Sequence, residues 1–235
     1  ALPIGQAASL DLNGASDQLI LDADADTTIS ADTDDQIDFK AGGTDIFQLT
    51  ATTATFNDGV TITTADNTDQ LTLKSTDADA AVGPVLTLHR ESSSPADDDI
   101  IGRINFIGED SGGTDTTYGR IETVIMQESN GSEDATMEFR IMSGGTERNV
   151  LELDRTEVCI NEDSQNINFR VESDDNDHML FVDAGDNRVG VGTAPDLGAG
   201  LHVRVSDSGA SVDASYDTLV VEESGHSGIQ ILSGT

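Results

Sequence analysis

The residues of this chain that could hold a metal ion are its acidic side chains, 45 in number against 11 Lys and Arg. The run from Asp22 to Asp26 alternates carboxylates as a calcium-binding loop does. However, Thr27 stands where such a loop needs glycine, and Thr33 where it needs a bidentate glutamate. A second acidic run covers residues 174–177. We interpret both runs as solvated turns, with weak Ca²⁺ or Mg²⁺ binding as the alternative, and we predict no metal or cofactor site.

No set of residues in the sequence forms a recognisable catalytic motif. The chain lacks a Gly-x-Ser-x-Gly elbow, a phosphate-binding loop and a His-Glu-x-x-His motif. Its single cysteine, Cys159, lies in a strand-like run and is expected to be a buried structural thiol, not a nucleophile. Carboxylate pairs suited to glycoside hydrolysis arise by chance among so many acids, and with no Trp and two Tyr there is little aromatic surface for sugars. We therefore expect no enzyme.

The histidines are too widely separated in sequence to suggest a ligand set. They are His89, His178, His202 and His226. Each is expected to be exposed or to lie on a strand face. The alternative is that, in a threefold assembly, one histidine of each chain meets its copies on the axis and traps an ion.

Composition argues against a self-sufficient core. Of the 235 residues, 36% are hydrophobic and 4% aromatic, below the roughly 45–50% apolar content of ordinary globular domains. The apolar residues nevertheless come in short β-branched runs, which predicts a thin, repeated core completed by other copies of the chain. The formal charge of −34 excludes nucleic acid and an anionic membrane surface as direct partners. Such a surface suits seawater or a saltier habitat, and no membrane span or secretory signal is expected.

The first half of the chain is expected to hold short strands. Residues 1–16 form an N-terminal arm, either an attachment segment or a flexible end. In residues 17–77, an Asp-Gln-apolar-x-apolar pattern starts at Asp17, Asp35 and Asp69, 18 and then 34 residues apart. With short runs between them, such as 60–63, this pattern favours stacked β-helix or β-prism rungs; the alternative is coincidence in an Asp-rich chain.

The second half is expected to hold longer strands and hairpins, with little or no helix. Residues 78–154 read as an antiparallel β-meander with glycine turns, and residues 155–193 as a hairpin-rich module. The turn Gly185-Asp186-Asn187 between two apolar runs is typical of a tight hairpin. Residues 194–235 continue as β-structure that leads into a missing C-terminal part. The longer strands are expected at 85–88, 101–107, 118–126, 136–142, 150–153 and 229–232.

Several runs resemble the fibre proteins of marine bacteriophages. These runs are residues 160–164 (INEDS), 169–173 (FRVES), 179–183 (MLFVD) and 188–193 (RVGVGT), together with the 86–107 segment. The resemblance covers residues 78–193 best. It implies an elongated, intertwined homotrimeric fibre, of a type often followed by a self-cleaving intramolecular chaperone.

On this basis we expect a non-catalytic tail fibre that projects from the phage particle and supports or performs host attachment. It would be made in the host cytoplasm, reside in the virion, contact other virion proteins through its N-terminal part, and meet a host-surface receptor for which a glycan is one candidate. The alternatives are a head fibre or decoration protein, a polysaccharide-degrading tailspike, and a bacterial surface adhesin.

Overall fold

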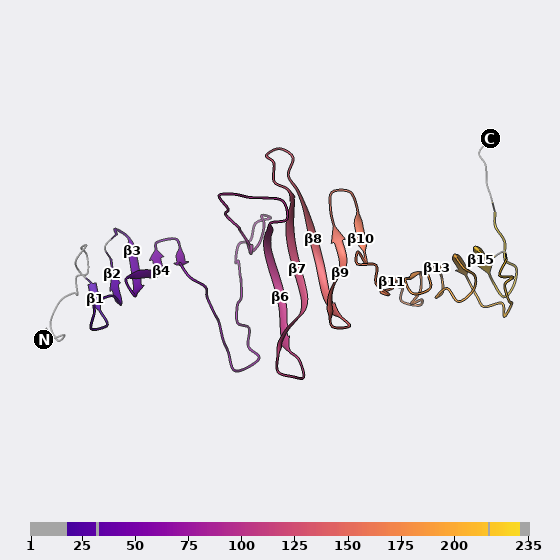
Figure 1. Cartoon of the computed structure of the whole chain (residues 1–235), viewed down its shortest axis with the longest axis horizontal. Coiled ribbons are helices and arrows are strands. Elements are labelled where there is room, and N and C mark those ends of the chain that lie inside the picture. Colours follow the sequence, from indigo (N-terminus) through magenta and orange to yellow (C-terminus); the bar gives the residue numbers. More distant parts are fainter. Residues whose placement is uncertain (1–17, 32, 216, 231–235) are drawn as a thin grey trace. The chain divides into compact units, whose positions relative to one another are not determined.

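β-Strands are the only regular secondary structure in the described part of the chain. The computed structural model describes residues 18–31, 33–215 and 217–230, and these form 15 strands in three five-stranded sheets, without a helix (Figure 1). The predicted all-β class is thus confirmed, while the predicted arm at 1–16 lies outside the described residues. Among the described residues, no helix has the length and apolar character needed to cross a bilayer. The chain divides after Val85 into two compact units.

The first unit contains sheet A, a meander in which each strand pairs antiparallel with the next in sequence. Two consecutive glycines at positive φ, Gly42 at 57° and Gly43 at 74°, make the tight turn between its two longest strands. Its strands are β1 (Gln18–Ile20), β2 (Thr28–Ser30), β3 (Gln36–Ala41), β4 (Thr44–Thr50) and β5 (Ala54–Phe56).

Residues 57–99 contain no strand, which corrects the strand predictions at 60–63, 69–73 and 85–88. The apolar side chains of these runs, including Val60, Leu71 and Leu86, are exposed. A run of β-forming residues becomes a strand only where another edge offers hydrogen-bond partners. Asp98 and Asp99 form backbone hydrogen bonds with Ile125 of β7, and Leu88 lies against Gly102 of β6. In the described residues the runs at 60–63, 69–73 and 85–88 nevertheless pair with no strand.

The second unit begins with sheet B, where the predicted antiparallel meander is confirmed. Left-handed glycines stand in its turns as expected: Gly113 at 78°, Gly131 at 85°, and Gly144 and Gly145 at 58° and 80°. The strands are longer than predicted. They are β6 (Ile100–Glu109), β7 (Asp115–Gln127), β8 (Asp134–Ser143), β9 (Thr146–Leu153) and β10 (Val158–Ile160).

Sheet C starts with the predicted hairpin and then changes its pairing. The positive φ of the hairpin turn falls on Asn187, at 55°, and not on Gly185. The last three strands stack in parallel, joined by loops 192–200 and 205–218. The apolar run predicted at 229–232 lies partly outside the described residues. The strands are β11 (Phe169–Val171), β12 (Leu180–Asp183), β13 (Arg188–Val191), β14 (Leu201–Arg204) and β15 (Leu219–Glu222).

Each sheet carries one row of hydrophobic residues in register across all five strands. In sheet A the row includes an aromatic ladder, with ring centroids 5.4 Å apart for Phe39 and Phe47 and 4.5 Å apart for Phe47 and Phe56. The rows are Leu19, Ile29, Phe39, Phe47 and Phe56 in sheet A; Ile104, Ile121, Phe139, Leu151 and Ile160 in sheet B; and Phe169, Val182, Val189, Leu201 and Leu219 in sheet C.

Burial is inverted relative to an ordinary domain. None of the described hydrophobic residues is buried, and 33 large ones are exposed. The buried side chains are polar or charged instead, such as Asp38 at 1%, Asn149 at 2% and Glu122 at 5% exposure. Asp38 accepts hydrogen bonds from the amides of Gln36 and Gln48 at 2.6 and 2.7 Å. Long polar side chains therefore bury one another on one face of a sheet. The apolar row lies on the other face, where none of its residues is buried.

The turn between β8 and β9 gives a test of the fold. A Cβ at Gly145 would meet no atom within 4 Å, so Gly145→Ala changes only the backbone preference at a φ of +80°. We expect it to lower the free energy of unfolding by about 1 kcal/mol, measured by denaturant unfolding. Gly225→Ala is the control, because its site is equally open and its φ is not positive. Equal effects of the two substitutions would contradict the assigned turn.

Candidate functional site

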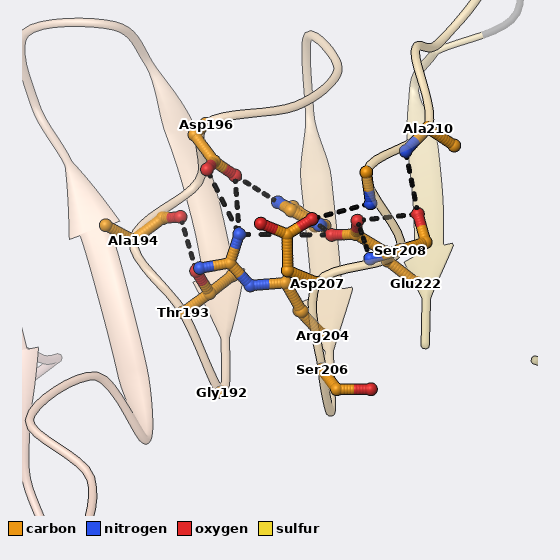
Figure 2. Close-up of polar contacts among 12 residues, drawn as sticks. Gly192, Thr193, Ala194, Asp196, Arg204, Ser206, Asp207, Ser208, Ala210 and Glu222 are labelled. Carbon is orange, nitrogen blue, oxygen red and sulfur yellow. Dashed lines mark hydrogen bonds and ion pairs between the residues drawn. The ribbon is translucent and has the colours of Figure 1, made fainter. Parts of the chain in front are cut away.

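A buried polar cluster lies on the face of sheet C that the two crossover loops cover. His202 and Arg204 are two residues apart on β14, so their side chains lie on the same face of the sheet. Glu222 lies opposite Arg204 on β15. Parallel neighbours need connections that run back over one face of the sheet. Loop 192–200 thereby brings Asp196 onto this face, and loop 205–218 brings Ser208 (Figure 2).

Close backbone approach makes this arrangement possible. A Cβ at Gly190 would collide with the carbonyl oxygen of Thr193, and one at Gly192 with that of Arg204. Gly198 and Gly200 meet the carbonyl oxygens of Asp217 and Thr218 in the same way. The glycine-rich sequence of this segment therefore lets the loops lie directly against the strands.

His202 is fully buried between two carboxylates. Its Nε2 lies 3.0 Å from Glu222 Oε2, and its Nδ1 lies at ion-pair distance, 3.3 Å, from Asp196 Oδ1, without hydrogen-bond geometry. Arg204 Nη1 donates to both Asp196 oxygens at 3.0 and 3.2 Å, as Figure 2 shows. The side chains of His202 and Arg204 thus contact those of Asp196 and Glu222.

Glu222 is the acceptor that holds the second loop. Its Oε1 accepts hydrogen bonds from the Ser208 backbone N–H and the Ser208 hydroxyl, both at 2.8 Å. These two bonds, with a smaller contribution from His202, lower the pKa of Glu222 below its ordinary value. Ser206 and Ser224 add a hydroxyl–hydroxyl hydrogen bond of 2.9 Å beside it. The cluster acts as a clamp on both loops.

His202 lies on a strand, as one of the two predicted placements has it, and it is buried there. Its side chain has 0% exposure, so it cannot meet its own copies on a symmetry axis. The signal that sequence reasoning missed is the glycine spacing from Gly190 to Gly200, which marks loops packed against parallel strands. A fully covered imidazole cannot reach a substrate, so this cluster does not offer general acid–base chemistry.

The polar face of sheet B holds an arginine–glutamate network. Glu122 accepts a hydrogen bond from Arg103 Nε at 2.6 Å and forms an ion pair with Arg140 Nε at 3.2 Å. Glu122, Glu138 and Glu152 stand directly opposite one another on three adjacent strands. Burial, with repulsion from Glu138 and Glu162, raises the pKa of Glu152. The carboxylates at Glu122 and Glu138 face arginines of their own chain, as structural ion pairs do.

Cys159 was predicted to be buried, but the structure shows it half-buried. It lies on β10, an edge strand with one neighbour, so part of its side chain remains open. A hydrogen bond with Glu162, followed by burial and charge repulsion, raises the pKa of the thiol to about 11. The thiol is therefore protonated at neutral pH and is a weak nucleophile.

The structure brings only one of the two acidic runs together. Ligand oxygens of Asp22, Asp24 and Asp26 lie within 4.8 Å of one another, the one such group in the part of the chain that is described. Hydrogen bonding from Thr27 lowers the pKa of Asp22. The 174–177 run is instead a turn organised by Asn176, whose Oδ1 accepts from the His178 N–H at 2.7 Å. Exposed carboxylates of this kind are ordinary for solvated turns, and we assign no ion to either run.

A depression of about 490 Å³ lies at the edge of sheet B. Arg155 and Asp134 form an ion pair of 3.2 Å in its wall, and no aromatic side chain lines it. Stacking on aromatic rings is a usual means of holding a sugar, and this depression lacks it. The lining residues are Met126, Gln127, Ser132, Asp134, Ala135, Thr136, Glu152, Asp154, Arg155 and Thr156.

The clamp on sheet C predicts acid sensitivity of loop 205–218. Because the folded-state pKa of Glu222 is lowered, its stabilising effect is present above the unfolded value of about 4.3 and is lost as pH falls through the folded value. We expect amide hydrogen exchange at Ser208, corrected for its intrinsic pH dependence, to accelerate on acidification. In Glu222→Gln the exchange should be faster at neutral pH and lose this acid dependence. Glu223→Gln is the control, and an unchanged profile in Glu222→Gln would contradict the clamp.

The chain matches no protein-family model and no curated protein. Its function is therefore argued from its residues and their geometry.

Proposed function

We propose that this chain is a structural segment of a virion fibre, namely a tail fibre that projects from a phage particle. It supports or performs attachment to the host surface and catalyses no reaction. The observation that carries this proposal is the inverted burial of the described residues, in which no hydrophobic residue is buried and each sheet exposes an apolar row. A chain built in this way acquires a core by assembling with others. The resemblance of residues 160–193 to phage fibre proteins supports the viral setting.

The assembly proposed is an elongated, intertwined homotrimer. Single-layer sheets with one apolar face suit a three-sided β-prism, in which each chain supplies one side and the apolar rows turn inward. The short strands of sheet A would form the rungs of such a prism. The strand-like runs in 57–99, which form no strand in the described chain, would pair with neighbouring chains and intertwine them. Length, stiffness and display follow from such continuous pairing.

The remaining partners follow from charge and from the resemblance. The N-terminal part would attach the fibre to other virion proteins. The fibre would bind a host-surface receptor, for which a glycan is one candidate. A formal charge of −34 opposes contact with nucleic acid or an anionic membrane. The fibre would be made in the host cytoplasm and reside in the virion. Antibody-labelled micrographs of particles test this location by showing whether the label falls on the tail or on the head.

The native mass of the purified chain is the decisive test. We expect three times the chain mass of 24.7 kDa by light scattering. Because like charges repel across the assembly, its melting temperature should be higher in 1 M salt, where the Debye length is about 3 Å, than in 0.01 M salt, where it is about 30 Å. A compact, cooperatively unfolding monomer would overturn the fibre proposal. Release of reducing ends from host polysaccharide would overturn the non-catalytic part.

A further inference from the structure

Sheet B has two faces of opposite character. Successive residues of a strand point to opposite faces, and on β8 the polar residues Thr136 and Glu138 are buried while Met137 and Ile141 are exposed. Strand registers place one row of hydrophobic residues, from Ile104 on β6 to Ile160 on β10, on the same face of all five strands. We call this the apolar face of sheet B; it comprises Ile104, Phe106, Ile121, Met137, Phe139, Ile141, Leu151, Leu153, Val158 and Ile160.

On the opposite face most charged groups are paired within the chain, although the buried Thr136 Oγ1 and Asn149 Oδ1 have no hydrogen-bond partner. Glu122 is held by Arg103 and Arg140, and Asn149 donates to Glu152 at 2.6 Å. Arg120 spans from Asn105, at 3.2 Å, to Glu147, at 3.1 Å. A face whose charges are paired among themselves gains little by binding a partner, because those groups would lose water without gaining new bonds.

Charge also distinguishes the two faces. The chain has 45 acidic residues, yet no carboxylate belongs to the apolar face of sheet B. Two copies that meet through this face therefore bring no acidic side chains into direct opposition, whereas contact through the other face would oppose Glu122, Glu138 and Glu152 to like charges. Exposed apolar surface of this extent marks an interaction site.

We propose that copies of this chain bind one another through the apolar face of sheet B, with the arginine–glutamate face turned to water. The inference rests on the proposed fibre function and adds which surface forms the interface. A second copy is the occupant because it carries the same uncharged hydrophobic row, and a row of this kind is present in each of the three sheets. Seven of the ten residues of this face belong to the exposed large hydrophobic residues of the chain, and Ile121, Phe139 and Leu151 are half-buried between them.

Two neighbouring residues of β6 provide a matched pair for the test. Ile104, 41% exposed, belongs to the apolar face, while Asn105, also exposed in the single chain, lies on the opposite face. Two variants are prepared in a Cys159→Ser background, one with Ile104→Cys and one with Asn105→Cys. The native mass of each purified variant is measured, and each is then treated with a maleimide. We expect labelling at position 104 to be at least about tenfold slower than at position 105, and the two rates to become equal after denaturation.

The outcomes separate the two proposals. Equal labelling in an oligomer, or protection at position 105 alone, would overturn this interface while leaving a fibre in place. A monomeric mass of the unsubstituted chain would overturn both. If Ile104→Cys fails to assemble, Val158→Cys on edge strand β10 replaces it, because Val158 is 64% exposed on the same face; free labelling of that residue in the oligomer would overturn the interface.

Discussion

Exposure of hydrophobic side chains is the constraint on which this structure depends. Burying apolar surface contributes about 25 cal/mol per Å² and is the dominant force in folding, but within one described chain no hydrophobic residue is buried. Three sheets with uncovered apolar rows are thus held mainly by backbone pairing and by polar contacts. In the proposed assembly the missing stabilisation comes from other chains, so that folding and assembly would be the same process.

The alternation of side chains explains how polar groups come to be the buried ones. A single-layer strand has two faces, and on sheets A and B the long polar side chains lean on one another across the strands. Asp38 between two glutamine amides and Glu122 between arginines show the same solution in the two sheets. Hydrogen-bonded carboxylates tolerate this burial because their partners replace the lost water. The paired polar face and the open apolar face are therefore two results of one pattern.

Sheet C departs from the other sheets because its last strands run in parallel. Its crossover loops fold back over the strands, so the chain covers part of this sheet by itself. The cover is polar: His202, Glu222, Arg204 and Asp196 bind one another where a globular protein would place hydrophobic residues. Such a network fixes the position of the loops without adding apolar surface, which suits a chain with so few large side chains.

Local pattern was sufficient to predict the parts of this fold that depend on neighbours in sequence. Alternation and glycine turns gave the meander of sheet B and the hairpin around Asn187. Prediction failed where a remote partner decides the outcome. The runs at 60–63 and 69–73 have strand composition but pair with no strand in the described chain. Cys159 is half-buried because β10 has one neighbour. The burial of His202 depends on parallel pairing, which alternation cannot distinguish from antiparallel pairing.

The acidity of the chain is compatible with the proposed assembly only if charge and apolar surface lie on different faces. A formal charge of −34 opposes contact between copies at long range, but screening limits this repulsion to about 8 Å at physiological salt. Within that distance the decisive groups are those directly opposed at the contact. Because the apolar face of sheet B carries none of the carboxylates, the hydrophobic effect would act there unopposed in the proposed assembly. The acidic residues elsewhere would keep the assembled surface hydrated and discourage lateral aggregation.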